Sequence, residues 1–348
     1  MIEANFGGTP FSIGVEEELM VLDRDSLELA PRAAELIAAA GGAGLPGMLK
    51  SELFASALEL NTGVCESAEE AAGALGELRR GAVELAEGLG LRIAAAGSHP
   101  KSRPEDQEIA DEPRYEEFVA YAGVSARRQG VNGLHVHVGM QSPEACFHAL
   151  EGVLPWLPVV LALSVNSPYL AGEETGLMSN RAEVLAQLPR SGAPPAFRSY
   201  ADWEEFIDRF VRLGISADYT RFWWDIRPHP RLGTLEIRIP DQPTALERTV
   251  ELVAALRALC MNVLGKPAVR YDPAGRGLYQ QNRWAASRFG LDAELFHPDG
   301  ERTARASELA TELLGREVSR TEADLQLEVG RARGLDAVCA DLVARTLS

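Results

Sequence analysis

Three short segments, far apart in the chain, alternate apolar side chains with charged or metal-binding ones. They are residues 14–19, 134–139 and 234–241. Because successive residues of an extended chain point to opposite sides, each segment predicts a strand with one packed face and one polar face. We expect the three polar faces to meet on one side of a sheet and to form a carboxylate-rich site for cations.

The period of two assigns individual side chains to these polar faces. The pairs that share a face are Glu16 with Glu18, His135 with His137, and Glu236 with Arg238. The residues between them, such as Val15, Val136 and Ile237, are apolar and predict the opposite, buried face.

A fourth segment, residues 55–60, adds a further carboxylate to the predicted site. The small residues Ala55 and Ala57 share a face with Glu59 and leave space above the sheet. Glu52 has the other parity, so it can join Glu59 only from a preceding loop or through a bulge.

Composition limits the partners of such a site. The chain has 348 residues, 46% of them hydrophobic, which is enough for a large core. The 34 basic and 51 acidic residues give a net charge of −17, so we expect no nucleic-acid and no membrane partner. An anionic ligand such as a nucleotide must then be held by bound cations and a few arginines.

The cysteines and the first residues indicate a cytoplasmic protein. Cys65, Cys146, Cys260 and Cys339 are dispersed and form no Cys-x-x-Cys pair, which favours a reduced compartment. The first residues show no basic region followed by an apolar stretch, so a signal peptide is not expected. The longest apolar region, residues 153–165, contains two prolines and is too short to span a bilayer.

A coarse reading of periodicity predicts one domain in which strands alternate with helices. Strands are expected near residues 11–22, 54–61, 92–97, 133–139, 222–227 and 233–239. Helices are expected over residues 67–88, 246–264, 303–314 and 322–331. Ser67 and Glu70 are spaced as in a capping box. The single domain therefore ends in a helical portion of about residues 276–348.

One phosphate-binding pattern occurs, and it is weak. Residues 42–47 match Gly-x-Gly-x-x-Gly, but a helical pattern precedes them and a proline interrupts them. A loop that ends a helix explains this segment better. No Gly-x-x-x-x-Gly-Lys-Ser/Thr sequence occurs, so any use of ATP requires another architecture.

Several blocks in the same order resemble the type 2 glutamate-cysteine ligase family of carboxylate-amine ligases. The blocks are residues 14–19, 58–65, 97–100, 133–139, 167–169, and 224–228 continuing to 241. The resemblance implies an α+β, glutamine synthetase-like fold, in which a curved, mostly antiparallel sheet carries the site on its concave face and helices pack outside. It also implies ATP-dependent joining of a carboxylate to an amine, with glutamate and cysteine as the reference pair.

The resemblance also assigns roles to residues of this chain. ATP and two or three Mg²⁺ ions, with Mn²⁺ as a substitute, are the implied cofactors. The implied metal ligands are Glu16, Glu18, Glu52, Glu59, His135 and Glu236. Arg238 and Glu236 would contact the nucleotide, and Arg238 and Glu59 would act in catalysis. Arg181 would bind a substrate carboxylate. Relatives can carry larger polar groups at Ala55 and Ala57, so the amine remains open.

Other interpretations of the same residues stay open. Residues 16–18 alone could be a solvated strand edge, and Arg238 could merely form a structural ion pair with Glu236. His135 and His137 could belong to a zinc hydrolase, although no third nitrogen or sulfur ligand is evident. The scaffold could also bind nucleotide and metal without turnover. Apolar helix surface would support a homodimer.

Overall fold

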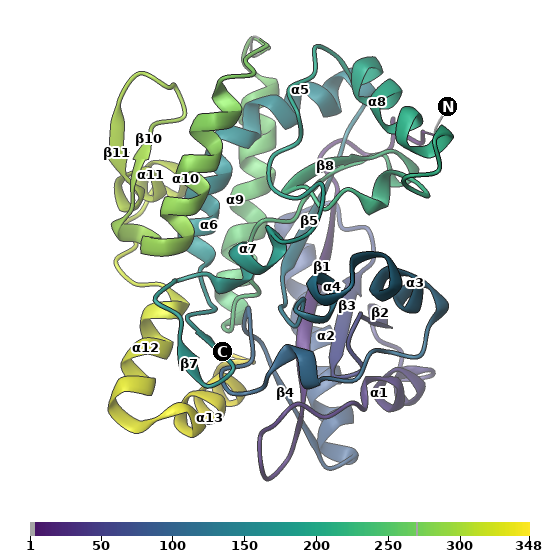
Figure 1. The fold of residues 1–348 in the computed structure, drawn as a ribbon, viewed down its shortest axis with the longest axis vertical. Helices are drawn as coiled ribbons and strands as arrows, with labels where there is room; N and C mark the ends of the chain where they lie inside the picture. The colour runs from purple at the N-terminus through teal and green to yellow at the C-terminus, as the bar shows by residue number, and fades with distance from the viewer. Residues whose placement is uncertain (1–3, 269–270) are drawn as a thin grey trace.

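A seven-stranded antiparallel sheet forms the centre of the protein (Figure 1). The computed structural model describes residues 4–268 and 271–348. The strand order is β2-β3-β1-β5-β9-β8, and β4 pairs with the far end of β1. The bounds are β1 Ile13–Asp23, β2 Gly47–Ser51, β3 Ala57–Thr62, β4 Leu91–Ala94, β5 Leu134–Gly139, β8 Ile226–His229 and β9 Thr234–Ile237.

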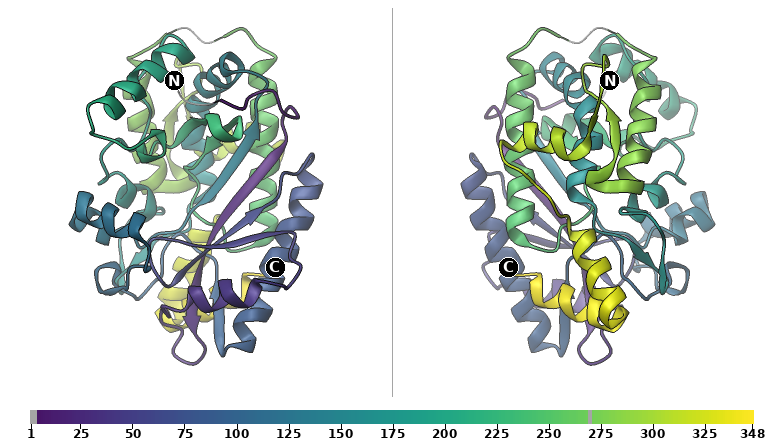
Figure 2. Two further views of the ribbon diagram at one scale, coloured as in Figure 1. Left: turned by 90° about the vertical axis from the view of Figure 1, so that its right-hand side faces the viewer. Right: turned by 90° about the vertical axis from the view of Figure 1, so that its left-hand side faces the viewer.

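Helices cover one face of this strongly twisted sheet (Figure 2). They are α2 (Ala68–Gly88) over β1, β3 and β4, α5 (Pro143–Val153) over β8 and β9, and α9 (Leu246–Leu264) over β5. The apolar halves of the alternating strands point toward them, and Val15, Val136 and Ile237 are at most 1% exposed. The opposite face of the sheet therefore carries the polar halves, as the alternation predicts.

The remaining elements surround this central sheet. They are α1 Ala33–Ala40, α3 Pro113–Ala122, α4 Val124–Arg127, α6 Leu157–Ser164, β6 Tyr169–Leu170, β7 Glu173–Glu174, α7 Asn180–Leu185 and α8 Tyr200–Arg212. The last part of the chain comprises α10 Gly275–Phe289, β10 Glu294–Phe296, β11 Thr303–Arg305, α11 Ala306–Leu314, α12 Glu322–Arg333 and α13 Leu335–Arg345. This part is mostly helical, but it also contains the β10–β11 hairpin.

Several predicted boundaries are wrong, and each error has a local cause. The helix expected over 303–314 begins only at Ala306, because residues 303–305 pair with β10. The strand expected from residue 222 begins at Ile226, because Phe222 and Trp224 pack into an aromatic cluster beside α8. The helix predicted over 246–264 is confirmed.

The N-terminus of α2 shows half of the expected capping box. The Ser67 hydroxyl accepts the backbone N–H of Glu70 at 3.1 Å. The Glu70 carboxylate accepts the N–H of Glu66 at 2.7 Å instead of the N–H of Ser67. The cap therefore satisfies two backbone donors, one of which lies a residue earlier than predicted.

One stretch, Pro143–Ser164, is long and apolar enough to cross a membrane by length and composition alone. In the folded protein, 72% of the 18-residue window that meets this test is buried. A core helix of a soluble protein passes the same test, so this stretch is weak evidence for a membrane span.

A buried ion pair fixes the direction in which β1 presents its three consecutive glutamates. Glu17 lies on the packed face, and its Oε2 accepts the Nε–H of Arg79 at 2.8 Å. Both side chains are fully buried. Arg79 also donates to the carbonyl oxygens of Thr244 and Thr346, each at 2.7 Å. Because Glu17 is held in the core, Glu16 and Glu18 point to the open face.

Candidate active site

The open face of the sheet forms the floor of a cavity of about 400 Å³. Strand register brings the predicted residues together there. The cross-strand pairs are Glu16 with His135, Glu18 with Glu59, His137 with Glu236, and Arg227 with Glu236. Glu52 reaches the cavity from the loop between β2 and β3, as its parity predicts. The residues with a predicted role at the site line this cavity, except Glu236; His137, which shares a face with His135, does not line it either.

The first potential cation site combines Glu16, His137 and Glu236, whose ligand atoms lie within 4.8 Å of one another. The Nδ1 atom of His137 pairs with the hydroxyl of Thr234 at 2.9 Å. Its Nε2 atom lies 3.6 Å from Glu16 Oε1, is buried, and has no hydrogen-bond partner in the described parts of the chain. A histidine held through one ring nitrogen, with the other free, has the arrangement of a metal ligand.

The second potential cation site consists of Glu18, Glu52 and Glu59, also within 4.8 Å of one another. Burial, reinforced by the charge of Glu59, raises the pKa of Glu18 to about 7. Burial and the charges of Glu59 and Glu18 raise the pKa of Glu52 well above its usual value. Carboxylates forced together in this way repel one another, and a divalent cation between them would remove the repulsion.

His135 lies between the two groups. Its Nδ1 is 3.2 Å from Glu16 Oε2, and its Nε2 is 3.9 Å from Glu18 Oε1. Burial and the nearby Arg238 charge lower the pKa of His135 to about 4, so the ring is neutral near pH 7. Its predicted role as a ligand stays a prediction. The sequence reasoning did not assign a ligand role to His137, although the period of two places it on the same face.

Two guanidinium groups hold Glu236. Arg227 donates to its carboxylate through Nε at 2.6 Å and Nη2 at 3.2 Å, and Arg238 donates through Nη1. Burial would raise the pKa of Glu236, but the charges of Arg227 and Arg238 hold it well below its usual value. Arg238 therefore forms the ion pair with Glu236 that the sequence left open as an alternative. Arg238 also lines the cavity. Sequence reasoning missed Arg227, which stands in the block 224–228.

The carboxylate of Glu16 is also kept ionised. Burial raises its pKa, but contacts with His135 and His137 outweigh burial and hold the pKa well below its usual value. The negative charge of the first group is thus balanced by cationic or hydrogen-bond-donating side chains, whereas the second group consists of carboxylates that repel one another.

Arg181 is fixed in the cavity wall. It is 3% exposed, and it donates to the carbonyl oxygens of Ile239 and Arg238, each at 3.0 Å. Its Nε has no partner among the described residues. A Cβ atom on Gly133 would lie 2.0 Å from Arg181 Nη2, so a glycine is needed where the guanidinium packs on the backbone. Arg181 also lines the cavity, and its role in binding a substrate carboxylate stays a prediction.

Comparisons with known proteins show the family to which the chain is related. The model of "Glutamate-cysteine ligase family 2 (GCS2)" matches residues 12–337. A Rubrobacter xylanophilus protein named "Putative glutamate--cysteine ligase 2-3" is 42% identical over 96% of this chain and 93% of its own length. A Sorangium cellulosum protein named "Putative glutamate--cysteine ligase 2" is 35% identical over 97% of this chain and 96% of its own length.

Solved structures share the fold. A crystal structure of glutamate-cysteine ligase from Francisella tularensis in complex with AMP matches with a TM-score of 0.72 and 15% identity, over 99% of this chain and 89% of that one. A bifunctional glutathione synthetase from Pasteurella multocida matches with a TM-score of 0.68 and 14% identity, over 97% of this chain and 51% of that one. At these identities the likeness concerns the fold alone. The expected α+β architecture, with a mostly antiparallel sheet and helices outside it, is confirmed.

Proposed function

Since this chain belongs to glutamate-cysteine ligase family 2, a family of carboxylate-amine ligases, we propose that it forms an amide bond at the expense of ATP with divalent cations. Glutamate is the proposed acid, and cysteine or another small-molecule amine is the proposed acceptor. The observation that carries the proposal is the arrangement of two carboxylate-rich groups side by side under a cavity lined with arginines.

The reaction requires such an arrangement. A carboxylate is a poor electrophile because its charge repels nucleophiles. Transfer of the γ-phosphoryl group of ATP to the carboxylate oxygen gives an acyl phosphate and ADP. The amine then attacks the acyl carbon, the carbon–oxygen bond to phosphate breaks, inorganic phosphate leaves and the amine nitrogen loses a proton. Catalysis consists mainly of positioning and of neutralising phosphate charge.

The two acidic groups fit Mg²⁺ or Mn²⁺. Both ions prefer oxygen ligands, and the all-carboxylate group of Glu18, Glu52 and Glu59 offers only oxygen. The other group offers the carboxylates of Glu16 and Glu236, which suit the same ions, beside the unpartnered ring nitrogen of His137. Two such groups among the described residues support two ions. When bound, these ions would offset the negative charge of the phosphates.

Two arginines, Arg238 and Arg181, are proposed to bind the anionic groups of the substrates. Arg238, held against Glu236, faces the cavity and is proposed to contact the transferred phosphoryl group. Arg181, fixed by two backbone carbonyls, is proposed to hold a carboxylate of the acid. A guanidinium offers several parallel N–H donors, so both residues suit planar oxyanions. Because these donors are held before substrate arrives, little reorganisation is needed when charge develops.

The first experiment measures ADP release from ATP and Mg²⁺ with glutamate and a series of amines, while mass spectrometry follows the product. Amine-dependent ADP release and a product mass equal to acid plus amine minus water are expected. Tight MgATP binding without an amide product from any pair of substrates would instead favour the alternative function, in which the protein binds nucleotide without turnover.

A carboxylate variant then ties the activity to the site. Glu59→Gln removes one ligand of the second group, and the ion pair that Glu59 makes with Lys50 is long, at 3.7 Å. Glu236→Gln is less clean, because it also leaves Arg227 and Arg238 without their counterion. We expect Glu59→Gln to lower turnover about 100-fold or more. Glu173→Gln, an exposed matched change on β7, should leave turnover unaltered. Equal activity of both variants would remove Glu59 from the mechanism.

A further inference from the structure

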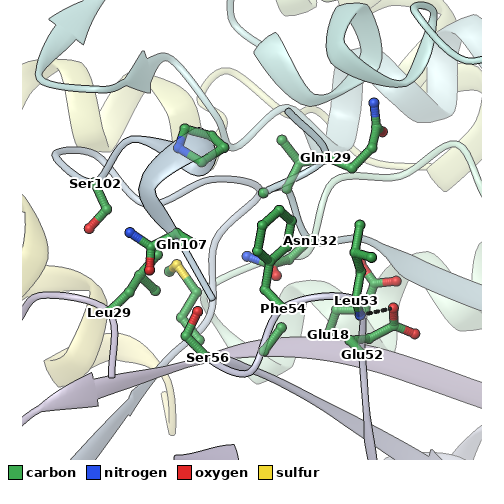
Figure 3. A pocket seen from close by; sticks show the side chains of 15 residues that line it. Glu18, Leu29, Glu52, Leu53, Phe54, Ser56, Ser102, Gln107, Gln129 and Asn132 are labelled. Atoms are coloured by element: carbon green, nitrogen blue, oxygen red, sulfur yellow. Dashed lines mark hydrogen bonds between the residues drawn. The ribbon is translucent and has the colours of Figure 1, made fainter. Parts of the chain in front are cut away.

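A second, smaller pocket adjoins the acidic group of Glu18, Glu52 and Glu59 (Figure 3). Its volume is about 40 Å³, against about 400 Å³ for the main cavity. Glu18 and Glu52 line both spaces, so the two meet at this acidic group. The pocket continues along the open face of the sheet, over Ala57 and its cross-strand partner Met20.

The walls of this pocket are held in place by contacts made outside it. Ser102, from the loop after β4, donates its hydroxyl to Glu28 at 2.9 Å. On the other side, Asn132 Nδ2 donates to the carbonyl of Ala96 at 3.2 Å. A Cβ atom on Gly130 would lie 2.8 Å from the side chain of Pro104, so glycine allows the two walls to close on each other. The pocket is therefore already formed in the absence of a ligand.

The charge of the lining limits what the pocket can bind. Among the described residues that line it, there is no lysine, arginine or histidine, and the only charged side chains are Glu18 and Glu52. The arginines of the site all line the main cavity. A phosphate or carboxylate placed in the small pocket would lose water without gaining a cation. ATP and an acidic substrate are thus excluded from it on electrostatic grounds.

Away from Glu18 and Glu52 the lining is uncharged. Phe54, Leu29 and Met20 supply apolar surface. Neutral polar side chains also line the pocket: Ser56, Ser102, Gln107, Gln129 and Asn132. The volume of this pocket is about a tenth of that of the main cavity, about 40 Å³ against about 400 Å³, so only a small group fits in it.

We propose that this pocket receives the substituent of the acceptor amine and restricts the acceptor to amines with a small side chain that carries no negative charge. The inference rests on the ligase function proposed above. The amine nitrogen would then lie at the junction of the two spaces, beside Glu18 and Glu52, and an α-carboxylate on the acceptor would face the arginines of the main cavity. Since no cysteine or histidine among the described residues lines the pocket, nothing there singles out a thiol.

The test compares acceptors at saturating ATP, Mg²⁺ and glutamate. The value of kcat/KM should be similar, within about tenfold, for alanine, serine and cysteine. It should fall about 100-fold or more for leucine and phenylalanine, because a small pocket rejects even one or two extra methylene groups by 10-fold or more. It should fall as far for glutamate, because the pocket offers no cation to a second carboxylate. Glutamate or phenylalanine used as well as alanine would overturn the inference, and so would cysteine favoured over serine by 1,000-fold.

A variant that fills the pocket makes the test specific. Ala57→Leu adds three carbons to the lining of this small pocket, and it should raise the KM for alanine about 30-fold or more while glycine remains an acceptor. Ala39→Leu, the same change at an exposed position of α1 outside the pocket, should keep the wild-type order of acceptors. The KM for ATP and the melting temperature of each variant show whether the fold is retained. Unaltered acceptor preference in a folded Ala57→Leu protein would refute the pocket assignment.

The outcomes separate this inference from the function on which it rests. Amide formation without selection by size and charge refutes the pocket inference and leaves the ligase function standing. Absence of amide product with every acceptor, including the small ones, refutes both.

Discussion

Glu17 and Glu18 are adjacent in the chain, yet the same substitution at each should change stability in opposite directions. Glu18 belongs to the acidic group on the open face, where burial and Glu59 raise its pKa from 4.5 to about 7. A group whose pKa is higher in the folded state binds its proton more tightly there. It therefore contributes stability below about pH 4.5, and this stability is lost as the pH rises through 7.

The magnitude follows from the size of this shift. At pH 8 without divalent cations, ionised Glu18 costs the folded state about 3 kcal/mol, since each pKa unit corresponds to about 1.4 kcal/mol. Unfolding entropy of about 2.1 cal/mol/K per residue gives about 0.7 kcal/mol/K for 348 residues, so 3 kcal/mol corresponds to about 4 °C. Glu18→Gln removes the charge and keeps the shape. In EDTA at pH 8, the variant should melt about 4 °C above the wild type.

Divalent cations should reverse this order. A ligand at 100 times its dissociation constant stabilises the folded protein by about 2.7 kcal/mol, and Glu18→Gln should bind the cation less tightly. Thermal melts in EDTA and in Mg²⁺, at pH 5 and pH 8, measure all four states. At pH 5 the two proteins should differ little, because Glu18 is then protonated in the fold.

Glu17→Gln is the matched control. It leaves Arg79 buried without its counterion, which costs about 3–5 kcal/mol and should lower the melting temperature by about 4–7 °C, with or without Mg²⁺. If Glu18→Gln also melted below the wild type in EDTA at pH 8, the reasoning about repulsion in the acidic group would be refuted.

Two further changes test how the site is held. Gly133→Ala places a Cβ atom 2.0 Å from Arg181 Nη2, so it should displace the guanidinium and raise the KM for the acid about 10-fold or more; steady-state kinetics with an unaltered KM would contradict the role of Arg181. His137→Gln removes the unpartnered ring nitrogen and should weaken Mn²⁺ binding about 10-fold or more, as measured by titration without nucleotide; unaltered affinity would place the ion elsewhere.

The sequence predicts the polar face of the sheet well, because strand alternation is a local signal. Glu16, Glu18 and Glu59 lie where their parity places them, and Glu52 comes from a loop as the parity requires. Periodicity alone does not predict which strands lie next to one another. That prediction came from the expectation that their polar faces form one site. The sequence blocks that resemble the ligase family, in the same order along the chain, supported this expectation.

The contacts that the sequence did not reveal are long-range. Glu17 looks like its two neighbours in the sequence, but its partner Arg79 is 62 residues away on a helix. Arg227 meets Glu236 only because β8 and β9 pair. Strand β2 was missed because Gly47–Ser51 has little alternation and is stabilised by pairing with β3. Such contacts depend on tertiary packing, which overrides local propensity.

The two acidic groups balance their negative charge in different ways, and this difference predicts how each substrate depends on cations. Around Glu236 the protein supplies Arg227 and Arg238. Around Glu18 and Glu52 the pKa values are raised, so the compensating charge must come from solution. The small pocket adjoins this second group. As free Mg²⁺ is lowered, we therefore expect the KM for the acceptor to rise more steeply than the KM for MgATP. MgATP is kept at a saturating concentration while the acceptor is varied. Equal dependence of both KM values on free Mg²⁺ would show that the two groups fill together, and the proposed coupling between the second group and the acceptor would then be wrong.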